Sequence, residues 1–593
     1  MRQTARRLVL ALVVLISCQQ PGKRQHPVLT ADYQTVQQAA QRFTPSLGVY
    51  GGEIVLPMLS EPATLNPITA TDPVAGECIR YLYEGLVSVD GVSLQPRPHL
   101  AQSWEVSPDG LTWTFHLRPG VQWSDGKELS AYDVAFTFDD CVFNDSINPN
   151  PARDLFGLHG KKPSVTAVDS LTVRVGLSTP CASFLRLMSQ EILPGHKYAQ
   201  YMRRGGFSRA LGLQTPPDSM VGTGPFMLDY IVPSQKMVFK RNPLYWQKDG
   251  ADNRLPYLDK IVYLAVQSHG AEVTRFKRGE FDYLMTTGND YPGLQKDNAK
   301  AAYVLHRLGP ATGSTFLMFN QNTGIDVQTG KPYLDSIKRS WFRAGAFRKA
   351  VAYALDKQGM INTALGGLGF SQWSPMSPAD GFYFDSSALR YEFDTAKAAQ
   401  TLRGAGFFYK TAGSVWVDAA GHAVEFNLAV SGGNALKEKI ADLVLKNLEQ
   451  FGFRVHLQVY DFSDLLKKID NPPYAWDATL LSLSGSSEPL DGFKVWQSSE
   501  ALHMWFPRQK APSTPWEASI DSIFAAAAVE VSDGKRKELF SRWQIIASDE
   551  LPLIYTVLPE RIVCITTKFC NVNPSVTGGI LDNIERMYIR KAP

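Results

Sequence analysis

Apolar and polar residues alternate along several short stretches of the chain, and the clearest example surrounds Phe115. Trp113, Phe115 and Leu117 alternate with threonine or histidine, which is the period-2 pattern of a strand with one buried face. Pro108-Asp109-Gly110 and Pro119-Gly120 favour turns on both sides of this segment. The pattern predicts a half-buried strand between two turns.

A helical period governs the segment that begins near Ser340. Phe347, Val351 and Leu355 recur every four residues and would form one apolar stripe on a helix. Ser340 is a candidate N-cap, and the two glycines at 366–367 would end the helix. The pattern predicts a long amphipathic helix in this part of the chain.

The same reasoning predicts two further helices and two strands. Asp394 is a candidate N-cap for a helix that continues through Leu402, and leucine and isoleucine spacing predicts another helix that ends at Gly452. Alternating residues then predict a strand over 455–459, and residues 551–563 predict one late strand. Strand-like and helix-like segments alternate throughout, which is typical of an α/β architecture.

The amino-terminal residues have the pattern of an export signal. Arginines precede nine uncharged apolar residues at positions 8–16, far fewer than the roughly 20 that span a bilayer, so a cleaved signal over residues 1–17 is predicted. Residues 15–18 fit a lipobox, which predicts a lipidated Cys18 followed by a polar tether to residue 50. The alternative is an ordinary secretory signal in which Cys18 is incidental.

Composition narrows the class of protein. The chain has 593 residues, of which 44% are hydrophobic and 11% aromatic, enough for several buried cores and more than one lobe. Its formal net charge of +3 is matched by three arginines in the signal, so the remainder is formally neutral and offers no electrostatic footprint for nucleic acid. No apolar run of membrane-spanning length follows the signal.

The cysteines beyond Cys18 are scattered and odd in number, which argues against a disulfide framework. One or two bridges stay possible in an oxidising envelope. The sequence does not pair these five residues, which are Cys78, Cys141, Cys181, Cys564 and Cys570.

Motifs for catalysis and metal binding are missing from the sequence. G-x-S-x-G, G-x-x-x-x-G-K-[ST], H-E-x-x-H and C-x-x-C do not occur. Gly222 and Gly224 could suggest a phosphate loop, but Pro225 follows them, so a turn is the better interpretation. The ten histidines do not pair at metal-ligand spacing. We therefore expect neither an enzyme nor a bound metal or cofactor.

A longer string gives a more specific indication. Residues 98–134 contain SWEVSPDGLTWTFHLRPGVQWSDG, which closely resembles the signature region of the family 5 extracellular solute-binding proteins. This family is the oligopeptide, dipeptide and nickel-binding group that serves ABC importers. The resemblance covers nearly everything after Gly51, with similar text at residues 61–67, 84–87, 221–228, 239–246 and 347–367.

The resemblance implies an α/β, periplasmic-binding-protein-like fold of type II, cluster C. Two large lobes would be joined by a hinge and accompanied by a smaller additional lobe. The expected layout is a signal peptide at 1–17, a tether at 18–50, lobe I at 51–76, 214–306 and 552–593, lobe II at 77–213, and lobe III at 307–551.

The resemblance also implies a function. The chain would be a monomeric, lipid-anchored lipoprotein on the periplasmic side of the bacterial cell envelope. It would capture an oligopeptide or similar small solute in an interlobe cleft and deliver it to the subunits of an ABC permease. Two alternatives stay open: the same fold binding a nickel chelate, sugar or opine, or a surface lipoprotein with an adhesin or structural role.

Peptide-binding members of the family place an acidic residue against the ligand's α-ammonium, in a segment that contains a tryptophan. The corresponding residues here, 483–492, lack that tryptophan and have Ser486 or Ser487 in place of the aspartate. Glu488 or Asp491 would then take over the role, because burying an unpaired ammonium costs several kcal/mol. The alternative is that this segment is a plain loop.

Other candidate ligand-binding residues follow from their positions in the family. Glu61, Leu65 and Asn66 would begin lobe I at the cleft. Lys467, with Lys468 beside it, corresponds loosely to a basic position that meets ligand carboxylates, although solvated lysines on a helix would look the same.

Aromatic residues supply the last candidates. Trp373 and Trp496 are candidate stacking walls, although a tryptophan is more often part of a core. The unusually aromatic stretch 503–517 would either line the cleft or pack within lobe III.

Overall fold

The computed structural model describes residues 43–157, 161–298, 302–411, 414–500, 502–575 and 577–590. The expected signal peptide and Cys18 lie outside these residues, as does most of the expected tether. Within the described part of the chain, no helix combines the length and the apolar character that crossing a bilayer requires.

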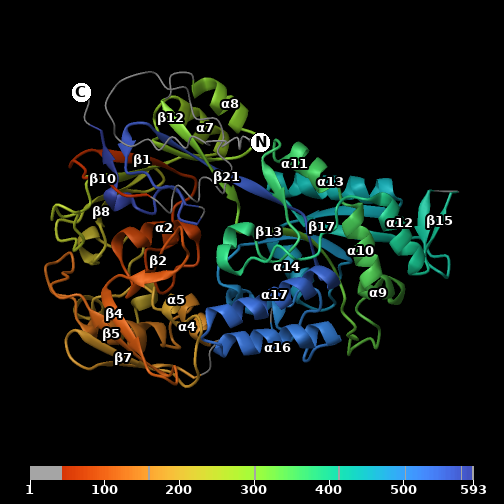
Figure 1. The fold of residues 1–593 in the computed structure, drawn as a ribbon, viewed down its shortest axis with the longest axis horizontal. Coiled ribbons are helices and arrows are strands. Elements are labelled where there is room, and N and C mark those ends of the chain that lie inside the picture. The colour runs from red at the N-terminus through yellow and green to blue at the C-terminus, as the bar shows by residue number, and fades with distance from the viewer. Residues whose placement is uncertain are drawn as a thin grey trace, which may run out of the picture.

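Lobe I, at the upper left of Figure 1, contains two main sheets. In the first, β1 pairs in parallel with β10, and β9 and β8 continue the sheet antiparallel. The first sheet consists of β1 (Glu53–Met58), β10 (Lys260–Ala265), β9 (Lys236–Arg241) and β8 (Phe226–Val232). The second consists of β11 (Tyr283–Thr286), β21 (Val557–Thr566) and β12 (Tyr303–Pro310), and β14 (Gly369–Ser371), from the part of the chain expected in lobe III, pairs with the start of β21. Lobe I also contains two helices, α7 (His269–Lys277) and α8 (Tyr291–Asp297). It is completed by a short strand pair, β22 (Phe569–Cys570) and β23 (Tyr588–Ile589).

Lobe II, at the lower left, is built on an antiparallel sheet whose strand order is β4-β5-β7-β6. These strands are β4 (Ala101–Val106), β5 (Thr112–Leu117), β7 (Thr172–Gly176) and β6 (Ser164–Ala167). The predicted strand around Phe115 is therefore confirmed as β5, with Phe115 and Leu117 almost fully buried. A small hairpin and helices accompany the sheet: β2 (Val87–Val89), β3 (Pro96–Pro98), α2 (Pro73–Leu82), α3 (Ala131–Phe136), α4 (Pro151–Gly157), α5 (Phe184–Leu187) and α6 (Gly195–Arg203).

Lobes I and II share one hydrophobic core. Ile54 and Leu56 of β1 belong to the same buried cluster as Phe115 and Val173 of lobe II. The glycine turn before Pro225 returns the chain to lobe I and passes the end of α2 so closely that a Cβ on Gly222 would lie 1.8 Å from the Leu82 carbonyl oxygen. The shared core predicts that the two lobes move as one body.

Lobe III, on the right of Figure 1, has a five-stranded sheet in the order β18-β17-β19-β13-β20. Its strands are β18 (Arg454–Tyr460), β17 (Glu425–Ser431), β19 (Ala478–Leu483), β13 (Ser314–Phe319) and β20 (Leu553–Tyr555). Strand β20 lies in this sheet, although the expected boundary at residue 552 placed it in lobe I. Leu317 and Phe319 face one core, whereas Phe316 and Met318 face another, so helices cover both faces of the sheet.

The helices of lobe III correct one prediction and confirm two. The segment from Ser340 to residue 367 forms three helices rather than one, so the prediction of a single long helix is wrong, as is the Ser340 N-cap. Asp335 caps the first helix, and the side chain of Asp356 accepts a hydrogen bond from the Gly359 amide (2.8 Å) to start the third. The three helices are α9 (Ser336–Arg343), α10 (Gly345–Ala354) and α11 (Lys357–Ala364).

The helices predicted after Asp394 and before Gly452 are both present. Asp394 accepts a hydrogen bond from the Lys397 amide (2.8 Å), and Gly452 ends its helix with a φ of 102°. These helices are α12 (Thr395–Gly404) and α13 (Ala435–Phe451), and the predicted strand that follows is β18. The remaining elements are β14 (Gly369–Ser371), β15 (Phe408–Lys410), β16 (Val415–Val417), α14 (Phe462–Asp470), α15 (Phe493–Trp496), α16 (Pro515–Val529) and α17 (Asp533–Glu550).

Two short connections cross between lobe I and lobe III. Residues 311–313 join β12 to β13, and Thr556 joins β20 to β21, so the single late strand predicted over 551–563 is divided between two sheets. The Thr556 amide donates to the Thr315 carbonyl (2.9 Å), so the two connections lie side by side. On the lobe I side, the Arg307 guanidinium binds both oxygens of the buried Glu560 carboxylate.

Candidate functional site

The candidate segment after β19 lies against the crossing connections. A Cβ on Gly485 would lie only 1.5 Å from the Thr312 carbonyl oxygen, and one on Gly313 would lie 3.0 Å from the Leu483 carbonyl oxygen. The two backbones therefore touch, and position 485 has no room for a side chain. This contact places residues 483–487 at the boundary between lobe III and the rest of the molecule.

Glu488 lies in a buried ionic cluster just after that contact. Its Oε1 is 2.5 Å from Nη2 of Arg536, and its Oε2 is 3.8 Å from Nε of Arg186. Oε1 also accepts a hydrogen bond from the Leu490 amide (3.3 Å), so Glu488 caps the short 3₁₀ helix Pro489–Gly492. Arg186 belongs to α5 of lobe II and Arg536 to α17 of lobe III, so the carboxylate joins two lobes.

The neighbouring polar groups of this segment bind one another. The Ser487 hydroxyl accepts a hydrogen bond from Nη1 of Arg186 (3.4 Å). The Ser486 hydroxyl donates to the Asp491 carboxylate and accepts from the Glu488 amide (3.1 Å). The structure therefore brings together four predicted residues, Ser486, Ser487, Glu488 and Asp491, and each already has a partner in the protein.

The predicted residues of lobe I lie elsewhere. The Glu61 carboxylate is partly exposed and accepts a hydrogen bond from the Ser234 amide (2.6 Å). Leu65 is fully buried in the core shared by lobes I and II. Asn66 is also fully buried, and its amide donates to the carbonyls of Phe207 (3.0 Å) and Ala210 (3.3 Å). Of these three, Glu61 has surface available to a solute.

The predicted lysines lie on α14, and the contacts of both are with other residues than the Glu488 cluster. Lys467 has 71% of its side chain exposed and pairs with Asp464 on the same helix (3.0 Å). The Lys468 ammonium lies 5.0 Å from the centre of the Tyr460 ring. Both arrangements are those of lysines on a solvated helix face.

The predicted tryptophans occupy different environments. Trp496 is buried and packs against Trp505 and Trp543, with ring centroids 5.6 and 5.2 Å away. Trp373 is half-buried, and the Lys357 ammonium lies 3.5 Å from its ring centre. Burial makes Trp496 a core residue in this structure, whereas Trp373 keeps part of its surface open.

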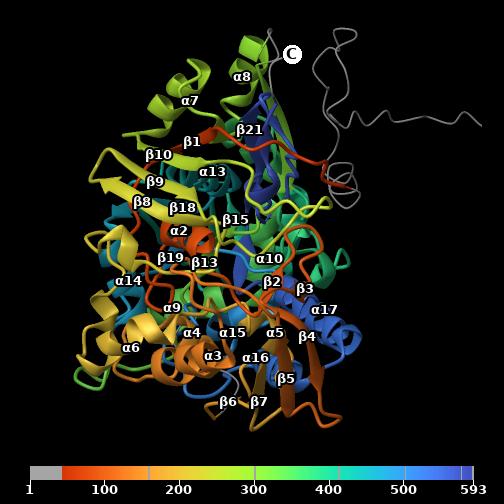
Figure 2. The ribbon, with the colours of Figure 1, turned by 90° about the vertical axis from the view of Figure 1, so that its left-hand side faces the viewer.

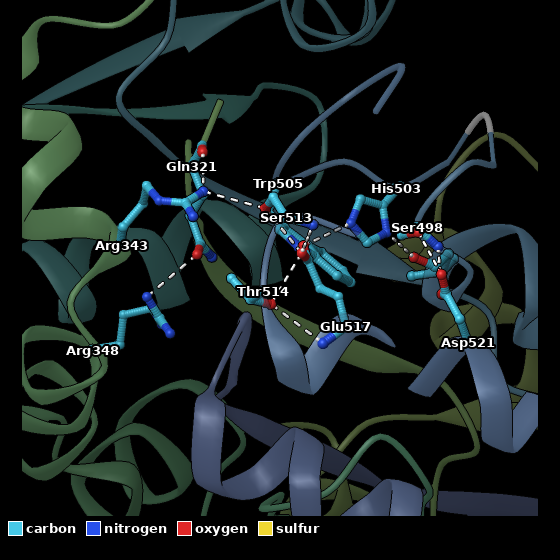
Figure 3. Close-up of polar contacts among 11 residues, drawn as sticks. Gln321, Arg343, Arg348, Ser498, His503, Trp505, Ser513, Thr514, Glu517 and Asp521 are labelled. Atoms are coloured by element: carbon cyan, nitrogen blue, oxygen red, sulfur yellow. Dashed lines mark hydrogen bonds and ion pairs between the residues drawn. The ribbon is translucent and has the colours of Figure 1, made fainter. Parts of the chain in front are cut away.

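The aromatic stretch 503–517 packs within lobe III, which decides between the two alternatives left open by the sequence. His503 and Trp505 are fully buried, and both contact the Glu517 carboxylate, at 3.3 and 3.2 Å (Figure 3). Ser513 donates to the same carboxylate (2.9 Å). Although burial opposes it, the hydrogen bond and charge of His503 and the Ser513 donors lower the pKa of Glu517 to about 2.

Two arginines of the cluster were missed by sequence reasoning. Arg186 and Arg536 are separated from Glu488 by long stretches of chain, and neither lies in a recognisable motif. The one local signal was the acidic residue before Pro489, which is typical of a helix N-cap and could have indicated a structural role for Glu488.

A second buried carboxylate joins lobes I and II. Glu84 accepts hydrogen bonds from Tyr245 (3.1 Å) and Trp246 (2.9 Å) and lies 2.8 Å from His99 Nε2. Glu84 comes from one of the sequence strings that indicated the family and the two aromatic residues from another. The hydrogen bonds of Glu84 therefore join the segments 84–87 and 239–246, both of which resembled the family.

Four of the cysteines that the structure describes are buried free thiols. Cys78, Cys141, Cys181 and Cys564 are buried and carry free thiols, so these four do not pair with one another. Burial raises the pKa of Cys181 to about 11 and that of Cys564 to about 12, which keeps both thiols protonated.

Comparisons with known proteins agree with this architecture. Residues 95–501 match the family model for bacterial extracellular solute-binding proteins, family 5, middle region. A probable ABC transporter-binding protein of Deinococcus radiodurans is 26% identical over 85% of this chain and 86% of its own. The oligopeptide-binding protein AppA of Bacillus subtilis is 25% identical over 86% of this chain and 87% of its own.

Solved structures show the same fold. NikA from Brucella suis, in complex with Fe(III)-EDTA, gives a TM-score of 0.74 at 21% identity and covers 91% of this chain and 100% of its own. AppA from Bacillus subtilis, in complex with a nonapeptide, gives a TM-score of 0.68 at 21% identity over 92% and 100%. The expected periplasmic-binding-protein-like fold is thus confirmed, and the named relatives are binding proteins rather than enzymes. Because the family model spans most of its length, the chain belongs to the bacterial extracellular solute-binding proteins of family 5.

Proposed function

We propose that this chain is the substrate-binding component of an ABC importer. It captures an oligopeptide or similar small solute between lobes I and III and delivers it, chemically unchanged, to a membrane permease. The observation that carries the proposal is the family match over residues 95–501 on a chain whose parts meet at two short crossing connections. We further propose that the protein is a monomer held on the periplasmic side of the envelope by a lipid on Cys18.

The arrangement of the lobes supports a closing movement. Lobes I and II share one core, whereas lobe III has its own two cores on either face of its sheet. Two bodies that are joined by a pair of adjacent short segments can rotate about them as about a hinge. A solute between the bodies loses its water when they close, which strengthens each polar contact.

The direct test is to identify what the protein carries. The purified protein is mildly denatured and the released small molecules are identified by mass spectrometry, and each compound is then added back in a thermal-unfolding assay. A solute at 100 times its Kd should stabilise the folded state by about 2.7 kcal/mol. A protein that releases no solute, and whose scattering profile is the same across peptide, metal-chelate and sugar libraries, would contradict the proposal.

A non-peptide solute is the second candidate. Glu488, the buried acid of this segment, is already balanced by Arg536 and lies close to Arg186, and Ser486 and Ser487 bind partners within the protein, so a peptide's ammonium would compete with existing contacts of Glu488. Similar folds have been solved with Ni(L-His), in NikZ from Campylobacter jejuni, and with stachyose, in MelB from Agrobacterium fabrum. Stabilisation by a chelate or an oligosaccharide but not by any peptide would favour this candidate.

A further inference from the structure

The cluster around Glu488 is more than a local ion pair, because its members belong to two different bodies. Glu488 and Arg536 both belong to lobe III, and their side chains are 5% and 3% exposed. Arg186 belongs to lobe II, and its side chain is 19% exposed. A movement of lobe III relative to lobes I and II therefore leaves the Glu488–Arg536 pair intact and separates Arg186 from Glu488.

Lobe II also contacts lobe III directly beside this cluster. The Ala182 amide donates to the Ala528 carbonyl (3.2 Å), and α5 lies beside the ends of α16 and α17 in both ribbon views (Figures 1 and 2). Arg186 also donates from Nη2 to the Leu94 carbonyl, which orients the guanidinium from within lobe II. Leu94 in turn packs near Gly381 of lobe III, where a Cβ would lie 3.3 Å from the leucine Cδ1.

The contact between Arg186 and Glu488 is longer than a hydrogen bond. Arg186 Nε is 3.8 Å from Glu488 Oε2, and that oxygen accepts no hydrogen bond from the described residues. A charge-assisted hydrogen bond of this kind is usually about 2.8 Å long. A closing movement of roughly one ångström would therefore create a hydrogen bond for a buried carboxylate oxygen that lacks one.

We propose that Arg186 and Glu488 form a clasp between lobes II and III, which favours the closed arrangement and tightens as the lobes close. The clasp also commits Glu488 to closure, so the charge of this carboxylate balances Arg536 and Arg186 rather than the ammonium of a solute. This proposal rests on the proposed function, because a clasp matters only where the two bodies separate to admit a solute.

Hydrogen exchange on the solute-free, full-length protein tests the clasp directly. Arg186→Met removes the charge and keeps most of the side-chain length, and Arg203→Met on the exposed face of α6 is the matched control within lobe II. We expect the backbone amides of residues 180–188 and 484–490 to exchange about tenfold faster in Arg186→Met. The control should exchange like the wild type, and both variants should keep the wild-type unfolding temperature within a few degrees.

Small-angle scattering on the same samples gives a second readout. Arg186→Met should have a larger radius of gyration than the wild type without solute, whereas Arg203→Met should not. Unchanged exchange and an unchanged radius of gyration in Arg186→Met would overturn the clasp. Neither measurement needs a solute, so a failure of the proposed function would not imitate a failure of the clasp.

The second part of the proposal is tested with two defined peptides. Binding of Ala-Ala-Ala and of N-acetyl-Ala-Ala-Ala is measured for the wild type and for Glu488→Gln. If Glu488 acts through closure, the substitution changes both affinities by the same factor. A selective loss of the free-amine peptide would show that Glu488 holds the solute's ammonium, and would overturn this part. If neither peptide binds the wild type, the exchange measurement decides the clasp by itself.

Discussion

At the scale of single residues, the buried carboxylates explain how this fold holds its parts in place. Glu84 joins lobes I and II, Glu488 joins lobes II and III, and Glu517 fastens the aromatic stretch of lobe III. Each has a cationic or hydrogen-bonding partner, since an isolated buried charge would cost several kcal/mol. Because such partners favour the ionised carboxylate, the free energy of unfolding depends on pH.

Glu517 provides the first prediction at this scale. Its pKa in the folded protein is about 2, below the ordinary value of 4.5, so its stabilising effect is present above about pH 4.5 and is lost as the pH falls through 2. Glu517→Gln should lower the free energy of unfolding by about 3 kcal/mol at neutral pH, because His503 loses its charged partner. Urea unfolding at several pH values measures both effects.

The control for this prediction is Glu538→Gln, an exposed residue on α17. It should change the free energy of unfolding by no more than about 0.5 kcal/mol. Equal losses in the two variants would contradict the role assigned to Glu517.

His269 provides the second prediction. Its ring lies between Glu272 (3.1 Å) and Asp290 (2.9 Å), and the hydrogen bond to Glu272, then that to Asp290, raises its pKa from 6.5 to about 9 against the effect of burial. The folded state therefore holds this proton more tightly, and the stability it contributes is full below about pH 6.5 and is lost as the pH rises through 9.

His269→Gln should remove this loss, so its unfolding temperature should fall less than that of the wild type between pH 6.5 and 9. Gln200→Ala, on the exposed face of α6, removes no titratable group, so it is the control and should keep the wild-type slope. Parallel curves for wild type and His269→Gln would show that the ring does not carry the extra proton.

At the scale of elements, two places where backbones approach closely require glycine. Gly485 allows the end of β19 to touch the connection at Thr312, and Gly222 allows the return to lobe I to pass the end of α2. Neither glycine has a positive φ that would explain it, so the reason is space rather than backbone freedom. The sequence showed these glycines but not what approaches them.

Gly485→Ala is the prediction at this scale. The added methyl group would lie 1.5 Å from the Thr312 carbonyl oxygen, so the segment or the crossing connection has to move. We expect a loss of about 2 kcal/mol in the free energy of unfolding, the usual cost of overpacking. Gly404→Ala at the end of α12 has open space around its Cβ and should cost nothing, which denaturant unfolding of both variants would show. A Gly485→Ala protein as stable as the wild type would contradict the close contact.

At the scale of the whole molecule, the chain divides into a body formed by lobes I and II and a body formed by lobe III. One core spans the first body, and two cores flank the sheet of the second. The connections between them are short and adjacent. This division is the physical basis for proposing that the protein closes over a solute.

Membrane attachment is the prediction for the whole molecule. A lipid on Cys18 would hold the protein on the membrane, since each buried CH₂ contributes about 0.8 kcal/mol. Cys18→Ser should move the protein from the membrane fraction to the soluble fraction when the two are separated by ultracentrifugation and blotted. Retention of the variant in the membrane fraction would contradict the anchor, and Cys78→Ser, which changes a buried thiol, is the control.

The sequence by itself determined the strand at Phe115, the caps at Asp394 and Gly452, and the family, because each depends on residues that are close in the chain. Only the tertiary structure decided that residues 551–563 divide between two sheets, that Asn66 and Trp496 are buried, and that Glu488 meets Arg186 and Arg536. Those outcomes depend on which distant segments become neighbours, and hydrophobic periodicity carries no information about that. The clasp between lobes II and III is such a contact, since Arg186 and Glu488 are 302 residues apart.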